Sequence, residues 1–365
     1  MFEFSLGDAF LDPQIQKEGF AHWKSPSNIA IVKYWGKHGR QLPSNPSLSL
    51  TLNNAYTEML LEYQPKGTET DRFTPITLQY LFEGKEEPKF QEKMLKFLEG
   101  LDEQFPFLRQ YHLHIQSLNT FPHSSGIASS AASMSALALC LCTMEHELFG
   151  TLESDLDFEQ KASFVARLGS GSASRSVFSR ASLWGYHEDV PGSSDYFAIG
   201  VEKEIDPIFH TYHDDILLIH KGQKSVSSTA GHALMKENPY AQTRFDQAKS
   251  NTKRLLDIMA AGDVEAFGHL AEQEALTLHA LMMSSDPSYI LMQPNTLQAI
   301  NKVREFRLET KIPLYFTLDA GPNIHLLYPH AHAEPITDFI ITDLVQFCQD
   351  QDYLADEVGE GPIQI

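Results

Sequence analysis

The sequence contains few cysteines, and they do not form a pattern typical of secreted proteins. Cys140, Cys142 and Cys348 are the three in 365 residues, and the first two lie close together in one apolar segment. An odd number with this spacing does not predict a disulfide framework and favours a reducing compartment. The first eight residues also lack the basic and apolar regions of a secretion signal. We therefore expect a cytoplasmic protein.

Basic residues are also scarce. The chain has 28 Lys and Arg against 48 Asp and Glu, which gives a formal net charge of -20. Nucleic acids and anionic membrane surfaces attract proteins that carry basic faces, so this charge argues against either as a partner. If the ligand is an anion, the few basic side chains must be concentrated where it binds.

One apolar run approaches the length of a membrane span, but its composition does not suit one. Residues 127–144 fall short of the roughly 20 apolar residues that a span needs, and serines crowd their first half. Small side chains favour close packing of a helix on a sheet, so we expect a core helix here. A chain of 365 residues is long enough for two domains or for one large α/β unit.

Residues 111–118 are expected to form a strand, and residues 119–135 lead from it through a loop rich in Gly and hydroxyl residues into a helix. The helix is expected from about Ser129. A helix start presents free backbone N–H groups and a positive dipole end, and both favour phosphate. The segment has neither the Walker pattern nor the dinucleotide-binding pattern of glycines. Ser129 and Ser130 are therefore candidate phosphate ligands, although an ordinary capped core helix would contain the same residues.

Basic side chains occur beside aromatic or hydroxyl residues at three places. Lys33-Tyr-Trp-Gly-Lys37 follows an apolar run, Arg175 lies in the Gly/Ser loop 169–176, and residues 221–229 follow a predicted strand. A guanidinium group among small residues suits bidentate binding of a carboxylate or phosphate. The alternatives are an edge strand that carries lysines and a surface arginine in a flexible loop.

Asp319 follows the predicted strand 314–318 and begins a tight turn, Asp319-Ala-Gly-Pro-Asn323. Asp in such a turn is ordinary turn chemistry. A carboxylate at a strand end beside Gly-rich loops is also a common position for a catalytic base. The residues alone leave both interpretations open.

Local patterns predict several further elements. Residues 21–35 are expected to form a strand, a turn at Ser25-Pro-Ser-Asn28 and a second strand, and residues 57–63 to pair with 76–82. Helices are expected at 242–260, 263–283 and 294–309.

Further expectations concern the histidine residues and one Asp-Pro pair. His279, in the second of these helices, is expected to be a packed or exposed helix residue. No group of His, Cys and carboxylate residues has the spacing of metal ligands, so we expect no metal site made by protein side chains. Asp206-Pro207 is the predicted domain boundary.

Five segments together resemble the signature blocks of the diphosphomevalonate decarboxylase family, a branch of the GHMP kinase superfamily. They occur in the family's order at residues 28–37, 119–132, 169–176, 226–231 and 316–323. The blocks Lys-Tyr-Trp-Gly-Lys and Asp-Ala-Gly-Pro-Asn are distinctive of this branch, whereas the Gly/Ser loop indicates only the superfamily. The resemblance implies an α+β protein with the GHMP kinase fold. It also implies an ATP-binding domain at 1–206, a C-terminal domain at 207–365 and an active site in the cleft between them.

The resemblance implies a reaction as well. ATP would phosphorylate the tertiary 3-hydroxyl of mevalonate 5-diphosphate, and phosphate and CO2 would then leave to give isopentenyl diphosphate and ADP. Mg2+ would accompany ATP, and the family suggests a homodimer. Neither a nucleic acid nor a membrane is expected as a partner.

The family's residue roles carry over where its motifs match. Asp319 corresponds to the catalytic aspartate that acts on the 3-hydroxyl, and Lys33 to its lysine partner. Arg175 corresponds to the arginine that holds the carboxylate destined to become CO2, with Ser172 assisting it. The other expected contacts are Tyr34, Lys37 and Ser228 for the substrate, and Asn28, Ser129 and Ser130 for ATP.

Departures from the family pattern leave the number of substrate phosphates open. His123-Ser-Ser-Gly126 stands where the family commonly has Thr-Ala-Ala-Gly, and Ser174-Arg-Ser176 where it has Cys-Arg-Ser. An arginine that the family uses on the diphosphate has no clean counterpart, and Arg72 is the nearest candidate. A mevalonate 5-phosphate decarboxylase is therefore an alternative. A mevalonate 3-kinase and a non-catalytic relative that binds ATP or a metabolite are further alternatives. Retention of Lys33 and Asp319 favours the full decarboxylase.

Overall fold

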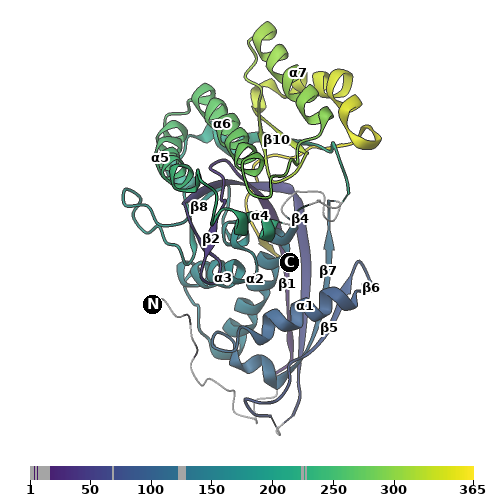
Figure 1. Ribbon diagram of the computed structural model, residues 1–365. Helices are drawn as coiled ribbons and strands as arrows, with labels where there is room; N and C mark the ends of the chain where they lie inside the picture. The colour runs from purple at the N-terminus through teal and green to yellow at the C-terminus, as the bar shows by residue number, and fades with distance from the viewer. Residues whose placement is uncertain are drawn as a thin grey trace.

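The computed structural model describes residues 4, 6, 17–67, 70–121, 129–222, 226 and 228–365. They form a lower and an upper part in the view of Figure 1, each built on one main sheet. Within the described residues, the strands of the lower sheet are β1 (Gly19–Ala30), β4 (Ser47–Pro65), β5 (Thr77–Phe82), β6 (Lys85–Glu86), β7 (Tyr111–Asn119), β8 (Ala181–Trp184), β9 (Ala198–Gly200) and β14 (Ile363–Gln364). Those of the upper sheet are β10 (Tyr212–Leu217), β11 (Tyr315–Leu318), β12 (Ile324–Pro329) and β13 (Tyr353–Leu354).

The lower sheet is mixed, and its longest strand organises it. The strands follow the order β14-β1-β4-β7-β5-β6. β4 has 19 residues, so its first part pairs with β8 and its second part with β7. β5 and β7 are parallel, whereas β4 is antiparallel to its neighbours. The predicted pairing of residues 57–63 with 76–82 is wrong, because β7 lies between these two strands.

β1 does not turn where the sequence predicts a turn. It runs through Ser25-Pro-Ser-Asn28 as one strand, and its register against β4 shifts between Pro26 and Asn28. Proline cannot donate to a strand ladder, and an irregularity of this kind accommodates it. The strand therefore continues, buried, to the segment that carries Lys33.

Helices pack against the lower sheet in one hydrophobic core. They are α1 (Pro88–Glu99), α2 (Ser129–Phe149) and α3 (Asp155–Gly169). α2 is the predicted core helix: its residues from Ser135 to Glu145 are buried, among them Cys140 and Cys142. No helix within the described ranges combines the length and the apolar character that crossing a bilayer requires.

The upper part places helices on a four-stranded antiparallel sheet of order β11-β12-β10-β13. Two of these helices, α6 and α7, pack against β11. The α-helices between Ser228 and the C-terminus are α4 (Ser228–Leu234), α5 (Ala241–Ala260), α6 (Val264–Met283), α7 (Pro294–Thr310) and α8 (Ala333–Phe339). The predicted helices 242–260, 263–283 and 294–309 are therefore confirmed to within a residue at each end.

The two parts share a hydrophobic core where they meet. Ile31 and Val32 of the lower part lie in one buried cluster with Phe209, Leu255 and Phe267 of the upper part. The end of the chain also returns to the lower sheet, where β14 pairs with β1. The side chain of Asp356 accepts hydrogen bonds from the backbone N–H groups of residues 53–55 at 2.7–2.9 Å. The predicted boundary at Asp206-Pro207 precedes β10 and stays a prediction.

Candidate active site

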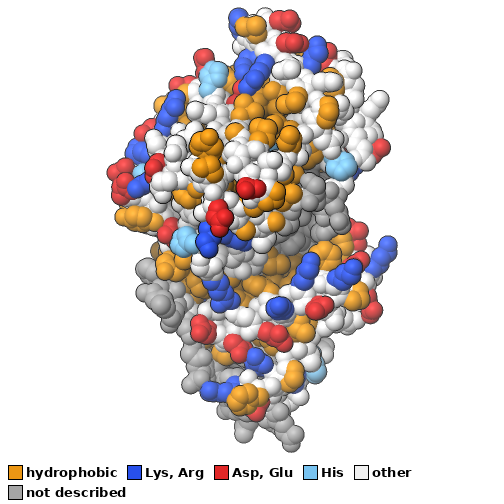
Figure 2. Space-filling model, in the orientation of Figure 1, with side chains coloured by type: hydrophobic (Ala, Val, Ile, Leu, Met, Phe, Trp, Pro, Cys, Tyr) orange, Lys and Arg blue, Asp and Glu red, His pale blue; other side chains and the backbone are white. Residues whose placement is uncertain are grey.

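The ten residues assigned to the site by the family motifs line one cavity of about 610 Å³. They come from both parts of the molecule: Asn28, Lys33, Tyr34, Lys37, Ser129, Ser130, Ser172, Arg175, Ser228 and Asp319. In Figure 2 the surface is hollowed between the two parts, and Lys and Arg side chains gather over α1 below the hollow. Lys93 of α1 is one of the cavity-lining residues.

Lys33 lies just after the buried end of β1. The backbone N–H groups of Ile31 and Val32 both donate to the carbonyl of Leu48, which holds this segment against β4. The Lys33 side chain is almost fully buried, and its ammonium donates to the carbonyl of Ala30. Burial lowers its pKa to about 8, and the nearby carboxylate of Asp319 is the largest charge that opposes this shift. A buried cation next to a carboxylate contradicts the alternative of an edge lysine exposed to solvent.

Asp319 is half-buried in the turn that follows β11. Its charge raises the pKa values of Lys33, Arg175 and His232, so it faces basic groups from three separate segments. It is also the only carboxylate among the described lining residues of the cavity. Turn chemistry alone does not account for a carboxylate that faces three basic groups in a cavity.

Arg175 is held in the short helix η2 (Gly171–Val177) with one nitrogen left for a ligand. Its side chain is buried, and Nε donates to Asn28 and Ser49. Nη1 is buried and has no hydrogen-bond partner in the described structure. Burial lowers the pKa of Arg175 to about 10, so the group stays charged at neutral pH. The alternative of a mobile surface arginine is wrong, and the orphaned donor suits an anionic group in the cavity.

Aromatic rings shape the wall beside Arg175. The ring of Tyr34 packs against Trp184 at 4.8 Å and against His232 at 4.3 Å between centroids. The Tyr34 hydroxyl is buried and has no hydrogen-bond partner among the described residues. It is therefore a second donor that could bind a ligand. A Cβ at Gly171 would lie 2.9 Å from that hydroxyl and 2.7 Å from Trp184, so a glycine is required for this close approach.

Lys37 and His232 lie on the same side of the cavity. Lys37 belongs to a small hairpin of β2 (Lys37–His38) and β3 (Leu42–Pro43), and its ammonium donates to Gln41 at 2.8 Å. Nδ1 of His232 accepts from the Gly36 N–H at 2.9 Å, and burial lowers the pKa of this histidine to about 3. His232 is therefore neutral at physiological pH, and Lys37 supplies the positive charge here.

The start of α2 also lines the cavity, beside the loop that leads into η2. Ser129 and Ser130 are its first residues, and the hydroxyls of Ser130 and Ser170 lie 3.0 Å apart. The loop that precedes them, including His123-Ser-Ser-Gly126, lies outside the described residues. Asn28 lines the cavity too, but its amide donates to Ser172 and Ser176, which places it beside Arg175. Its predicted contact with ATP stays a prediction.

Comparison with known proteins assigns this arrangement to a family. Residues 25–197 match the family model of the diphosphomevalonate decarboxylase-like N-terminal domain. Residues 216–362 match that of the mevalonate 5-diphosphate decarboxylase C-terminal domain. The chain belongs to the diphosphomevalonate decarboxylase family.

Relatives with named activities cover most of the chain. A diphosphomevalonate decarboxylase of Ganoderma lucidum is 31% identical over 87% of this chain and 80% of its own length. A phosphomevalonate decarboxylase of Haloferax volcanii is 25% identical over 85% of this chain and 88% of its own length. The family therefore includes relatives named for either number of substrate phosphates.

Solved structures support the fold at full length. MDDEF in complex with MVAPP, AMPPCP and magnesium superposes with a TM-score of 0.79 at 26% identity, over 96% of this chain and 99% of that one. The mevalonate diphosphate decarboxylase of Staphylococcus aureus gives 0.80 at 25% identity, over 96% and 98%. The predicted fold class, α+β with the GHMP kinase fold in two domains, is confirmed.

Several lining residues of this decarboxylase-family cavity were not predicted from the sequence. They are Trp35, Gln41, Lys93, Thr229 and His232. The sequence does contain a signal for Lys93, because basic side chains recur on α1 in a chain that is otherwise acidic. Arg72, the candidate for the missing diphosphate arginine, lies in an exposed turn and is not among the described lining residues.

Away from the cavity, the structure gathers a histidine pair and a carboxylate that the sequence did not indicate. The ligand atoms of His213, His330 and Glu357 lie within 4.8 Å of one another, and the two histidines are hydrogen-bonded at 2.9 Å. The three residues are far apart in the sequence, so their spacing could not predict this group. The expectation of no side-chain metal site rested on that spacing alone.

Proposed function

We propose that this chain catalyses the ATP-dependent decarboxylation of mevalonate 5-diphosphate to isopentenyl diphosphate, with release of ADP, phosphate and CO2. The observation that carries the proposal is the meeting of Asp319, Lys33 and Arg175 in one cavity of a family member. Each of the three supplies what one step requires: a base, a cation for the leaving phosphate and a donor for a carboxylate. The complex of a relative with MVAPP and AMPPCP supports the same pair of substrates.

The first step is phosphoryl transfer to the substrate. Asp319 orients the tertiary 3-hydroxyl and accepts its proton while the hydroxyl oxygen attacks the γ-phosphorus of ATP, and ADP leaves. Lys33 faces the same carboxylate, whose negative charge opposes the lowering of the Lys33 pKa by burial. Phosphoryl transfer depends mainly on such positioning and on electrostatic stabilisation.

The second step breaks two bonds in the phosphorylated intermediate. The C–O bond to phosphate cleaves, and the electron pair of the bond to the carboxylate carbon forms the double bond as CO2 leaves. Lys33 stabilises the negative charge that develops on the departing phosphate. Arg175 holds the carboxylate through its free Nη1 and Ser172 assists, so the breaking C–C bond is kept in line with the leaving group.

ATP and Mg2+ would occupy the side of the cavity at the start of α2. Ser129 and Ser130 offer hydroxyls beside the positive end of a helix of 21 residues, and that donor set fits phosphate oxygens. With no carboxylate there among the described lining residues, Mg2+ would be held by ATP phosphates, water and a serine hydroxyl. Bound there, it would neutralise phosphate charge.

Assembly and location are part of the same proposal. The family resemblance supports a homodimer, which light scattering on the purified chain would measure. The three cysteines are all buried and free, which supports a reducing, cytoplasmic location.

A second candidate function is decarboxylation of mevalonate 5-phosphate. The Haloferax volcanii relative is named phosphomevalonate decarboxylase. Arg72, the candidate for the diphosphate arginine, is not among the described residues that line the cavity. The test is ATP-dependent CO2 release from mevalonate, its 5-phosphate and its 5-diphosphate, compared in parallel. Preference for the diphosphate supports the proposal, and preference for the monophosphate replaces it with this candidate.

Lys37→Ala is expected to weaken binding of the diphosphate substrate far more than binding of the monophosphate. Lys37 is the cavity lysine on the side of Tyr34, and the proposal assigns it to the terminal phosphate. A lost hydrogen bond to a charged group costs about 1.5–3 kcal/mol, so KM for the diphosphate should rise more than tenfold. Steady-state kinetics on both substrates measures this, with Lys24→Ala, which lies outside the cavity, as the control. Equal losses on both substrates would contradict the assignment.

A further inference from the structure

Helix α6 carries two buried side chains that contact the backbone of the proposed reacting pair. Glu274 and His279 are 0% and 1% exposed, and neither lines the cavity. They are five residues apart, about one and a half helical turns. Because they do not reach the substrate space, any effect on the reaction must pass through the residues they hold.

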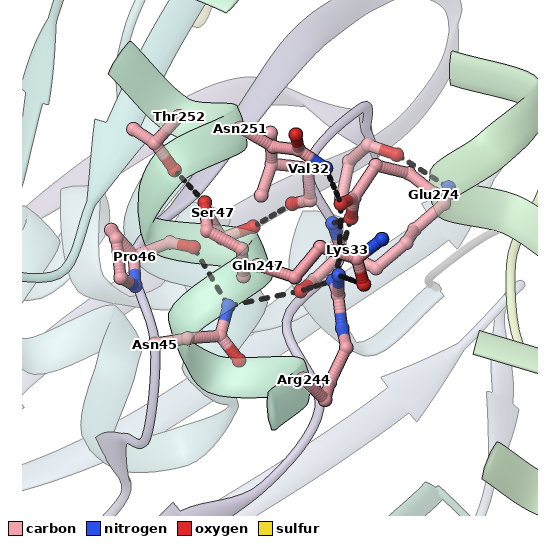
Figure 3. Close-up of polar contacts among 12 residues, drawn as sticks. Val32, Lys33, Asn45, Pro46, Ser47, Arg244, Gln247, Asn251, Thr252 and Glu274 are labelled. Atoms are coloured by element: carbon pink, nitrogen blue, oxygen red, sulfur yellow. Dashed lines mark hydrogen bonds and ion pairs between the residues drawn. The ribbon is translucent and has the colours of Figure 1, made fainter. Parts of the chain in front are cut away.

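Glu274 accepts hydrogen bonds from three groups that surround it (Figure 3). Its Oε2 accepts from the backbone N–H of Lys33 at 2.9 Å and from Arg244 at 2.6 Å. Its Oε1 accepts from Arg244 at 2.8 Å and from Asn251 at 2.6 Å. The carboxylate is therefore fully engaged, and one of its contacts fixes the N–H of Lys33.

Arg244, on α5, contacts the backbone carbonyl group of Lys33. Its Nη2 donates to the carbonyl of Lys33 at 3.0 Å, and Asn45 donates to that carbonyl at the same distance. Arg244 is also buried, and Figure 3 shows its side chain reaching up to both Glu274 and Lys33. The two polar backbone groups of Lys33 are thus held by an ion pair of the upper part.

His279 makes the corresponding contact to the other reacting residue. Its Nε2 lies 3.1 Å from the carbonyl oxygen of Asp319. A carbonyl can only accept, so the imidazole carries a hydrogen on Nε2 and donates it. The backbone of Asp319 is therefore tied to the same helix that ties Lys33.

Stability alone does not account for this arrangement. A buried Arg–Glu pair is expensive to desolvate, and well-packed apolar side chains of similar volume are often at least as stabilising. What apolar side chains cannot do is direct the N–H and C=O groups of Lys33. The hydrogen-bonded pair therefore provides orientation that packing would not.

We propose that α6 is the positioning element of this active site: Glu274, with Arg244, holds the backbone of Lys33, and His279 holds that of Asp319, so one rigid helix sets the distance between the ammonium and the carboxylate. The proposal rests on the proposed function, since it concerns the geometry of that reaction. Glu274, Arg244 and His279 are positioning residues, and they touch neither substrate. A misplacement of about 1 Å in such a pair can lower a rate on the order of 100-fold.

The first test replaces the ion pair with apolar side chains in the double variant Arg244→Met/Glu274→Met. No charge is left buried and unpaired, but the Lys33 N–H and the Asn251 amide lose their acceptor, so the melting temperature should fall while the protein remains folded. We expect kcat for CO2 release to fall about 10- to 100-fold, with KM for ATP and for the substrate within about twofold of the parent. A change confined to kcat indicates positioning, whereas a general loosening of the fold would raise KM as well.

A pH profile gives a second readout from the same variant. Lys33 is faced by Asp319, Glu274, Asp214 and Arg175, and the three carboxylates raise its pKa against the effect of burial. The double variant removes Glu274 together with the cation of Arg244, and of the two only Glu274 is among the charges that shift the pKa of Lys33, so this pKa falls. If the charged form is required, the loss of activity on the alkaline side should then begin at a lower pH in the variant.

The chain offers a matched control for the ion pair. Lys161 of α3 and Glu145 of α2 form another buried pair at 2.5 Å, with side chains 3% and 1% exposed, and neither lines the cavity. Lys161→Met/Glu145→Met should change the melting temperature by a comparable amount and leave kcat and the pH profile unchanged. If it lowers kcat to the same extent, the effect is one of stability and the positioning role is wrong.

The second test uses His279 and does not depend on the ion pair. His279→Gln keeps an N–H donor at about the same reach, whereas His279→Leu removes it. We expect kcat to fall at least tenfold in the leucine variant and to recover in large part in the glutamine variant. Equal activity in the two variants would overturn the role of His279.

The outcomes separate this inference from the proposed function. A parent enzyme that releases no CO2 from any of the three substrates contradicts the proposed function itself. An active parent together with a folded double variant of unchanged kcat contradicts the positioning role of α6. If the double variant does not fold, the two His279 variants decide the question alone, and parental kcat in His279→Leu overturns the proposal.

Discussion

Replacing Asp319 by Asn is expected to abolish most of the CO2 release while leaving the fold and ATP binding intact. The amide keeps the shape of the carboxylate but cannot accept the proton of the 3-hydroxyl. Loss of a general base typically costs about 10²–10⁴-fold in rate. The amide also removes the negative charge that raises the pKa of Lys33, so the cation is disturbed as well. Steady-state kinetics together with an ATP-binding measurement would show this split.

A suitable control for this variant is another turn aspartate. Asp71 lies in an exposed turn, where its side chain accepts from the backbone of Phe73, and it does not line the cavity. Asp71→Asn should retain the parental rate. A rate for Asp319→Asn within a few-fold of the parent would remove the base from the mechanism.

Arg175→Lys is the second variant with a large expected effect, although the charge is conserved. The guanidinium reaches Asn28 and Ser49 with Nε while Nη1 remains free for a ligand, and an ammonium group cannot do both. Loss of one charged hydrogen bond to the substrate carboxylate costs about 1.5–3 kcal/mol, which corresponds to a fall of roughly 10- to 100-fold in kcat/KM for CO2 release. ATP affinity should change little, because the proposal assigns the ATP phosphates to Ser129 and Ser130 and not to Arg175.

Arg167→Lys is the matched control for that measurement. Arg167 is equally buried, donates to backbone carbonyls of Tyr196 and Arg40, and does not line the cavity. It should therefore affect stability more than catalysis. If Arg175→Lys weakens ATP binding instead of CO2 release, Arg175 belongs to the nucleotide site and its assigned role is wrong.

Local patterns predicted the helices well because each pattern reports a face that a single helix buries. The clearest case is α5, expected at 242–260 and found at Ala241–Ala260. The strands were less predictable. Pro26 and its neighbours read as a turn, but pairing of β1 with β4 on both sides of the irregularity keeps them in one strand. β7 separates β4 from β5, which no pattern within either strand could indicate.

The cavity-lining residues that lie in sequence motifs could be predicted. Lys33, Arg175 and Asp319 are distant in sequence, yet each lies in a block that resembles the family, and the structure brings them to one cavity. Lys93 was missed because a lysine on an amphipathic helix usually faces solvent. The role of His279 could not be read from α6, because its contact with Asp319 exists only once β11 packs on that helix.

The most direct test of the proposed function is the stoichiometry of the products in a single reaction of the parent enzyme with ATP, Mg2+ and mevalonate 5-diphosphate. ADP, inorganic phosphate and CO2 should appear in equal amounts, because Asp319, Lys33 and Arg175 act on one bound substrate in sequence. ADP formed without CO2 would mean that the chain phosphorylates the 3-hydroxyl and stops, and the assignment of Lys33 and Arg175 to decarboxylation would be contradicted.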